Sequence, residues 1–236
     1  MKLGQNRDVL EKMRQEYEVF DHFPWYVTAH QWASLAADAG SSLSVGDAKG
    51  GILSIVTGAT DNNEAAIATA NEAFLFGADR PMNFEALLQY TEPGTNEGNV
   101  AFGVGDAIGA DLITDGGAAL AIPNTGAMIY KLDGGTVWRC GCKCNSVSVD
   151  SVSVQTAGGS SYQRLRIDVI AVDGTNLEIT YFLDGAPLTD SNGKAIKHRL
   201  AYASATEMDF GAYAKTGATA ASMTLKLDYI YGAMRF

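Results

Sequence analysis

The chain has 236 residues, of which 47% are hydrophobic, and its formal net charge is −10 at pH 7. This length and apolar content are enough for one large domain with its own core. The acidic balance argues against a nucleic-acid-binding surface, which needs clustered Lys and Arg, and no stretch reaches the roughly 20 apolar residues of a membrane span. We therefore expect no nucleic acid and no membrane among the partners.

Residues 1 to 24 are predicted to form a short N-terminal helical arm. Asn6 can cap a helix that runs from about Arg7 to Val19, in charged surroundings. An apolar stripe on this helix is the predicted partner-binding surface, and it consists of Leu10, Met13, Tyr17 and Phe20. Because a short helix is marginal alone, it must pack either on the body of the protein or on another chain. The residues leave both alternatives open.

Residues 25 to 236 are predicted to form a single all-β domain. Short apolar runs separated by turn residues recur about every 8–12 residues, which is typical of an antiparallel sandwich or barrel. The predicted strands up to residue 105 are 26–30, 41–45, 51–57, 65–70, 83–91 and 99–105. Residues 106 to 126 are rich in Gly and Ala and are predicted as a loop around one weak strand. Further strands are predicted at 147–154, 209–215 and 222–235.

A hairpin is predicted around Asp133-Gly134-Gly135. Its apolar residues are all even-numbered, so a three-residue loop would place them on one face: Met128, Tyr130, Leu132, Trp138, Cys140 and Cys142. The cysteines at 140, 142 and 144 alternate along one strand, where neighbouring Cα atoms lie about 6.5–7 Å apart, at or beyond disulfide reach. We expect buried, reduced thiols near Trp138 and Met128, without metal.

The clearest hairpin lies between residues 161 and 188. Ile167 and Val169 are predicted to share the buried face with Ile179 and Tyr181, while Arg164, Arg166 and Glu178 face away. This parity requires a loop with an odd number of residues. We predict the three-residue loop 172–174, with Gly174 in the left-handed conformation of a bulge.

No constellation of catalytic residues is found. The histidines His22, His30 and His198 are scattered, His198 is predicted to lie in a solvated loop, and no G-x-S-x-G nucleophile elbow occurs. The stretches 61–64 and 190–193 are rich in oxygen ligands that suit Ca²⁺, but Asp, Asn and Gly also build ordinary turns, which is the preferred interpretation. We therefore predict no catalytic, cofactor-binding or metal-binding residue, and no enzyme.

Two stretches resemble a known family. In ITYFLDGAPL, Ile179 to Leu188, a strand ends in Asp-Gly; LKLDYIYGAMRF, Leu225 to Phe236, carries an Asp-Tyr pair before its final apolar residue. Both resemble elements of the concanavalin-like, or laminin-G-like, jelly-roll sandwich, and FEALLQY and NVAFGVG resemble its paired strands. The stretch WASLAADAGSSLSVGDAKGGILSIVTGATDNNEAA resembles segments common in tailed-phage virion proteins built on this sandwich. The resemblance implies an antiparallel jelly roll over residues 25 to 236.

Function does not follow from this fold alone. The glycanase branch of the family carries a Glu-x-Asp-x-(x)-Glu strand, which this sequence lacks. The phage resemblance, the arm and the missing signal peptide favour a virion structural protein, a capsid decoration or cement-like subunit of a tailed phage. It would be made in the host cytoplasm, lie on the capsid surface and bind capsid protein or copies of itself. The alternative is a carbohydrate-binding, lectin-like module that binds surface glycans. A glycan hydrolase is less favoured than either.

Overall fold

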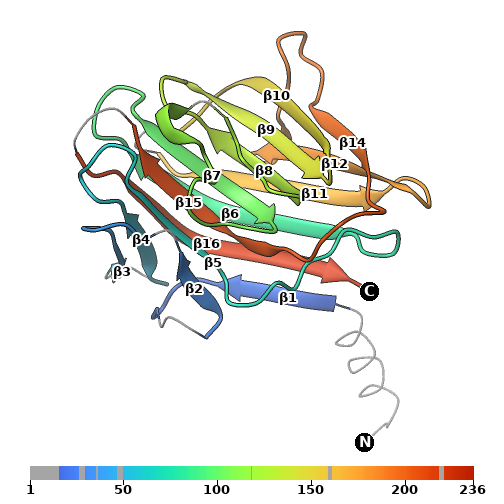
Figure 1. Cartoon of the computed structure of the whole chain (residues 1–236), viewed down its shortest axis with the longest axis horizontal. Helices are drawn as coiled ribbons and strands as arrows, with labels where there is room; N and C mark the ends of the chain where they lie inside the picture. The colour runs from blue at the N-terminus through green and yellow to red at the C-terminus, as the bar shows by residue number, and fades with distance from the viewer. Residues whose placement is uncertain are drawn as a thin grey trace, which may run out of the picture.

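The computed structural model describes residues 16–26, 30–35, 37–46, 50–117, 119–158, 161–217 and 221–236. These residues form an antiparallel sandwich of two stacked β-sheets (Figure 1), as the strand spacing predicts. The one helical element that the structure describes is a short 3₁₀ turn, η1 (Asp115–Gly117). None of the described residues form a helix that is long and apolar enough to cross a membrane.

One sheet has nine strands. They are β1 (Glu16–Asp21), β3 (Ser42–Gly46), β4 (Ile52–Val56), β6 (Met82–Thr91), β11 (Gln163–Ala171), β12 (Asn176–Leu183), β13 (Ala186–Pro187), β14 (Lys197–Ala201) and β16 (Thr224–Arg235). Their order is β13-β12-β11-β6-β16-β4-β3, with β1 also paired to β16 and β14 to β12. Along β6 burial alternates with every residue, which leaves the other face of this sheet in contact with water.

The second sheet has seven strands. They are β2 (Trp32–Leu35), β5 (Glu64–Thr69), β7 (Gly98–Gly105), β8 (Thr125–Lys131), β9 (Val137–Cys144), β10 (Val147–Thr156) and β15 (Asp209–Thr216). Their order is β10-β9-β8-β7-β15-β5-β2. Every residue of β5, β7 and β8 is buried, so the sheet is covered on both faces at these strands, whereas the edge strand β10 is largely exposed.

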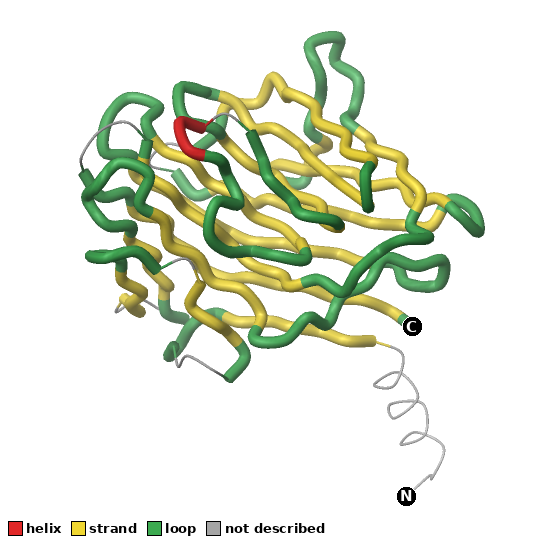
Figure 2. The backbone as a smooth tube through the Cα atoms, in the orientation of Figure 1, coloured by secondary structure: helices red, strands yellow, loops and turns green. Residues whose placement is uncertain are grey.

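Two hydrophobic clusters explain that difference. The main core fills the space between the sheets and contains Phe84, Phe102 and Phe210. A second cluster lies on the outer face of the seven-stranded sheet, where Tyr130 and Tyr213 meet apolar residues of the connection between β7 and β8. That connection crosses the sheet and includes η1 (Figure 2).

The predicted arm helix is wrong over residues 16–19, because these residues belong to β1. This strand pairs antiparallel with the last strand, from Glu16 opposite Arg235 to Asp21 opposite Ile230. The charged and apolar residues of this segment also fit a helix. Pairing with β16 and the burial of Val19 stabilise it as a strand instead. Residues 7 to 15 of the predicted helix lie outside the described residues. The division between an arm at 1–24 and a body from 25 stays a prediction.

The parity of the β11–β12 hairpin is confirmed. Ile167 pairs with Tyr181 and Val169 with Ile179, and all four side chains are fully buried. The predicted left-handed Gly174 is wrong, since its φ is outside the positive range. The carboxylate of Asp173 organises the turn instead, accepting hydrogen bonds from the backbone N–H groups of residues 175 and 176 at 2.8 Å.

The parity of the β8–β9 hairpin is wrong. Ile129 pairs with Cys140, and Tyr130 pairs with Arg139, so the loop between the last aligned positions has an even number of residues. Trp138 and the three cysteines therefore enter the main core, whereas Met128 and Tyr130 point to the outer face and join the second cluster. The even-numbered apolar residues of β8 are buried there by the connection between β7 and β8, which alternation within the hairpin cannot reveal.

Candidate functional site

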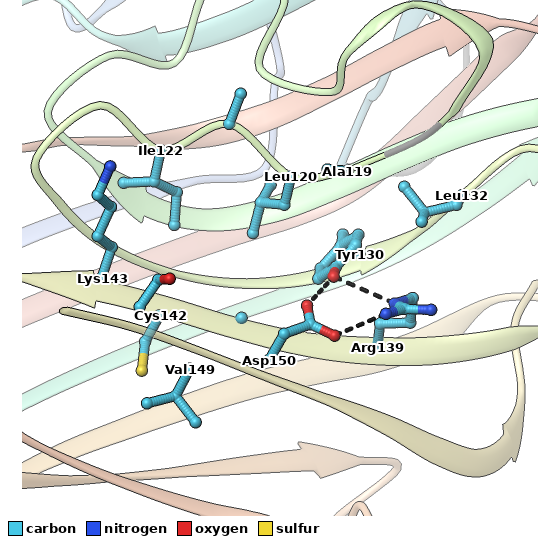
Figure 3. Close-up of a pocket in the computed structure, with 13 residues that line it drawn as sticks. Ala119, Leu120, Ile122, Tyr130, Leu132, Arg139, Cys142, Lys143, Val149 and Asp150 are labelled. Carbon is cyan, nitrogen blue, oxygen red and sulfur yellow. Dashed lines mark hydrogen bonds and ion pairs between the residues drawn. The ribbon is translucent and has the colours of Figure 1, made fainter. Parts of the chain in front are cut away.

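A pocket of about 390 Å³ opens on the outer face of the seven-stranded sheet (Figure 3). Its floor is formed by β8, β9 and β10, and one wall is the loop that carries Leu120 and Ile122. The volume lies in the range of small-molecule sites, which combine apolar walls with a few convergent polar groups. This pocket has both.

Three polar side chains meet on its floor. The Tyr130 hydroxyl donates a hydrogen bond to Asp150 Oδ2. The Arg139 Nε donates to the Tyr130 hydroxyl at 3.1 Å, and Nη2 lies 2.7 Å from Asp150 Oδ1. Figure 3 shows the three groups facing one another at one end of the pocket. Each is held by the other two, so the trio is oriented before any ligand arrives.

Strand pairing brings these residues together from three separate positions in the sequence. Tyr130 and Arg139 are opposite each other in the β8–β9 pair, and Asp150 on β10 is opposite Gly141 of β9. Gly141 lets the loop wall approach the pocket floor closely, because a Cβ there would lie 2.6 Å from Leu120 Cδ2 and 3.2 Å from Tyr130 Cε1. The position of Leu120 in the wall therefore depends on the missing side chain of Gly141.

The trio combines a neutral phenol, a cation and a carboxylate. Burial raises the pKa of Tyr130, and its hydrogen bond to Asp150 raises the pKa further, so the phenol keeps its proton. The side chains of Arg139 and Asp150 are 31% and 41% exposed. Two of the five N–H donors of Arg139 are used within the trio, which leaves the others for a ligand.

The loop wall is anchored by a fully buried lysine of β15. The Lys215 ammonium lies 2.7 Å from Asp115 Oδ1 and 3.1 Å from Asp111 Oδ1, and it donates to the Ile113 carbonyl at 2.9 Å. Both carboxylates belong to the loop between β7 and β8. Nearby, Glu64 accepts hydrogen bonds from the Asp111 N–H at 3.0 Å. These contacts fix the loop against the sheet and define one side of the pocket.

The residues of the predicted arm surface do not form one stripe in the described structure. Tyr17 points toward the core and packs edge-on against Phe74 at 5.3 Å, whereas Phe20 lies on the opposite side of β1 and is 48% exposed. Successive strand residues alternate sides, so positions 17 and 20 diverge. Leu10 and Met13 lie outside the described residues. Their predicted role in partner binding stays a prediction.

The predicted solvated position of His198 is wrong. This residue belongs to β14, is 3% exposed, and its ring nitrogens lie 3.0 Å from the Tyr181 hydroxyl and 3.0 Å from Ser151 Oγ. Burial lowers its pKa to about 4, which favours the neutral ring. Its charged neighbours in sequence, Lys197 and Arg199, point to the other side of the strand.

The predicted burial of the cysteines is confirmed, since Cys140, Cys142 and Cys144 are all buried free thiols. Burial raises the pKa of Cys142 to about 12, so this thiol is unreactive. Their predicted contact with Met128 is wrong, because Met128 faces the second cluster.

The two oxygen-rich stretches are engaged within the protein. Asn62 accepts the Gly116 N–H at 3.2 Å, and Asp190 accepts the N–H groups of residues 192 and 194 at 2.9 and 3.0 Å. These are turn-stabilising bonds. Across the ranges that the structure describes, no group of three or more His, Cys, Asp or Glu side chains is placed to hold a metal ion.

Sequence reasoning missed the trio at Tyr130, Arg139 and Asp150. The interpretation of Tyr130 as a core residue of one hairpin face removed it from consideration. A signal was present, because Arg139 is a cation on β9 and Asp150 is the one charged residue of β10. Opposite charges at positions that can pair across neighbouring strands indicate an ion pair on the solvent face.

Comparisons with known proteins agree on the fold. Neither a protein family model nor a curated protein matches the sequence. Among solved structures, an endo-1,3-β-glucanase from Streptomyces sioyaensis is similar with a TM-score of 0.62 and 14% identity, over 93% of this chain and 96% of that one. The carbohydrate recognition domain of Emp47p matches with a TM-score of 0.58 and 12% identity, over 93% and 96%. A protein of unknown function from Shewanella oneidensis MR-1 matches with a TM-score of 0.58 and 12% identity, over 100% and 95%.

These identities are too low to carry a function from one protein to another, but the similarity spans nearly the whole of each chain. The two-sheet topology, the antiparallel pairing and the structural matches agree with one another. The chain has the jelly-roll sandwich fold of concanavalin-A-like lectins and glucanases.

Proposed function

We propose that this protein binds a saccharide in the pocket on the outer face of the seven-stranded sheet. The observation that carries the proposal is the trio of Tyr130, Arg139 and Asp150 on the pocket floor. Sugar hydroxyls both donate and accept hydrogen bonds, and the trio offers an exposed carboxylate acceptor beside unused guanidinium donors. The apolar wall at Leu120 and Ile122 suits the C–H face of a sugar ring.

The residues of the pocket favour saccharide binding without hydrolysis. Glycoside hydrolysis uses two carboxyl groups on either side of the scissile bond. Among the described residues that line the pocket, Asp150 is the only carboxylate. Similar structures include both a glucanase and a carbohydrate recognition domain, and the single carboxylate favours a role like that of the second.

The test is calorimetric titration of the purified chain with oligosaccharides of β-1,3-glucan, cellulose, mannan and galactan. At least one should bind, and Asp150→Ala should weaken that binding about tenfold or more, since it removes an acceptor and releases Arg139. Asp168→Ala is the matched control, because Asp168 forms an equally exposed ion pair with Arg166 on the other sheet. It should leave the affinity unchanged.

Gly141→Val provides an independent variant, since its side chain would collide with Leu120 and displace it from the pocket wall. It should abolish binding while the thermal midpoint shows whether the fold persists. Equal affinities of Asp150→Ala and the unchanged protein, or no binding by any of the four oligosaccharides, would refute this proposal.

Capsid decoration is the second proposal, and the exposed aromatic ring of Phe20 is the observation that favours it. A virion protein on a phage capsid would use this ring, and residues before β1, to contact capsid protein or another copy of itself. The test is cosedimentation with particles of a variant that lacks residues 1 to 15. Deletion must stop there, because residues 16 to 21 form β1 of the nine-stranded sheet. Unchanged sedimentation of the truncated protein would count against the arm.

A further inference from the structure

A second pocket, of about 490 Å³, lies where β1 leads into β2 and is lined mostly by aromatic residues. We name it the aromatic pocket, and it is formed by Phe20, Trp25, Tyr26 and Trp32 together with the polar residues Asp21, His30 and Gln31. Trp25 is 73% exposed and Phe20 is 48% exposed. Two large exposed rings that share one concave surface are unusual for a protein surface and mark a binding site.

The backbone that presents Trp25 is held in place. Asp21 Oδ1 accepts the Phe23 N–H at 2.6 Å, and Asp21 Oδ2 accepts the Trp32 indole N–H at 2.8 Å. Phe23 itself is fully buried at a φ of 52°, and its ring centre lies 6.0 Å from that of Trp32. Two residues further on, Trp25 extends into solvent. The backbone on either side of the pocket is therefore fixed at Asp21, Phe23 and Trp32 without a ligand, which lowers the entropic cost of binding one.

The chemistry of the pocket selects a ligand with an apolar face and a hydroxylated rim. A purely apolar ligand would cover the side chains of Gln31 and His30 without giving them hydrogen bonds, which is costly. A small ion would leave the indole of Trp25 unused. A pyranose ring satisfies both demands, because its C–H groups can stack on the indole while its hydroxyls reach the carboxylate, amide and imidazole.

We propose that the aromatic pocket is a second saccharide-binding site, in which a sugar ring stacks on Trp25. It shares no lining residue with the pocket at Asp150. The two proposed sites can therefore be tested separately, although both would bind saccharides.

Tryptophan fluorescence reports on this site selectively. The chain has three tryptophans, and Trp32 and Trp138 are 2% and 0% exposed. Trp25 is the one that acrylamide reaches. Titration with oligosaccharides of β-1,3-glucan, cellulose, mannan and galactan should give, for at least one of them, a saturable blue shift and a loss of acrylamide quenching.

Variants separate this site from the first one. Trp25→Ala should weaken the binding of that oligosaccharide by calorimetry about tenfold or more, and Trp25→Tyr, which keeps a ring, should retain most of it. Asp150→Ala should leave the fluorescence response unchanged. Because Trp25 is mostly exposed, Trp25→Ala should also keep the urea midpoint of the unchanged protein, so that a loss of binding is not a loss of fold.

Three results would overturn the inference. The first is a fluorescence that responds to none of the four oligosaccharides. The second is calorimetric binding of equal strength by Trp25→Ala and the unchanged protein, and the third is a fluorescence response abolished by Asp150→Ala. If light scattering finds a dimer in which acrylamide no longer reaches Trp25, the pocket is instead an interface between two copies of the chain.

Discussion

The outer faces of the two sheets differ in their exposure to solvent. On the nine-stranded sheet the outer face stays in water and carries ion pairs, such as Arg166 and Asp168 of β11, which lie 3.2 Å apart. On the seven-stranded sheet the outer face carries small residues, and the connection between β7 and β8 covers it with a second apolar cluster. One face is stabilised by solvation, the other by burial.

This difference shows what small side chains permit. A Cβ at Gly126 of β8 would lie 3.0 Å from Ile122 Cγ2 of the loop, and a Cβ at Gly141 of β9 would lie 2.6 Å from Leu120 Cδ2. Glycines at such positions have no side chain that would hold the loop away, so the loop can pack closely on the sheet. The cost is that Lys215 becomes fully buried and depends on the loop carboxylates. The pocket at Asp150 remains where the loop ends.

The largest expected effect comes from that lysine. Lys215→Met keeps the apolar stem but removes the charge, which leaves buried Glu64 without a nearby cation and frees Asp111 and Asp115 from the sheet. We expect a loss of about 3 kcal/mol in the free energy of unfolding, measured by urea denaturation.

The matched control on the open sheet is Lys197→Met. Lys197 lies 2.6 Å from Glu178, and its side chain is 50% exposed. Its replacement should change stability by less than about 1 kcal/mol. Equal losses in the two variants would mean that the two outer faces do not differ as described.

A pH dependence of intermediate size is expected from Asp209, the first residue of β15. Burial, together with the nearby Glu72, raises its pKa to about 6, above the value of about 3.9 in an unfolded chain. The folded state therefore favours the protonated form, and ionisation destabilises it as the pH rises from about 4 to 6. Asp209→Asn should be more stable than the unchanged protein by roughly 2 kcal/mol at pH 7 and equal to it near pH 3.

Asp190 supplies a control of opposite sign. Backbone N–H groups of Lys194 and Asn192 lower the pKa of this exposed carboxylate, so its ionised form stabilises the fold above the unfolded pKa. Asp190→Asn should reduce stability at pH 7, and the loss should vanish as the pH falls. Denaturation midpoints at both pH values measure the two signs, and a shared sign would contradict the assignment.

The smallest expected effect is a difference in stability between glycine variants at two turns of the nine-stranded sheet. Gly185 has a φ of 86°, so Gly185→Ala should cost about 1 kcal/mol. Gly174 has no positive φ and nothing within 4 Å of an added Cβ, so Gly174→Ala should be neutral or stabilising by up to about 1 kcal/mol. Thermal midpoints compare them, and a larger loss at Gly174 would restore the left-handed bulge that alternation predicts.

Local patterns predicted the parts of the fold that depend on neighbours in sequence. Alternation in β6 and in the β11–β12 hairpin assigns the buried faces correctly, because each of those strands buries only one face. In β8 the same rule fails, since the connection between β7 and β8 folds back over the sheet and covers its second face. The β-structure of residues 16–19 was missed because its partner, β16, lies at the other end of the sequence.

The candidate site could not be predicted, for the same reason. Tyr130, Arg139 and Asp150 become neighbours only when three strands align in register, and the wall at Leu120 arrives through the long loop. A one-residue error in the β8–β9 register sends Tyr130 to the wrong side of the sheet. The opposite charges of Arg139 and Asp150 indicate an ion pair, but nothing in the sequence indicates that Tyr130 and Leu120 lie beside it. His198 likewise appears solvated between two basic residues until β14 pairs with β12.

The pairing of β1 with β16 has a consequence for the order of folding. The bond between Arg235 Nε and Glu16 Oε1, 3.3 Å long, joins residues 219 positions apart. Closing a loop of this length costs conformational entropy, and the contacts of β1 form only after most of the chain is ordered. We therefore expect β1 to dock last and to detach first. Amide protons of β1 should then exchange with solvent before those of β6 and β11. Detachment would uncover the edge of β16 from Ile230 to Arg235, where the β1 of a second copy could enter.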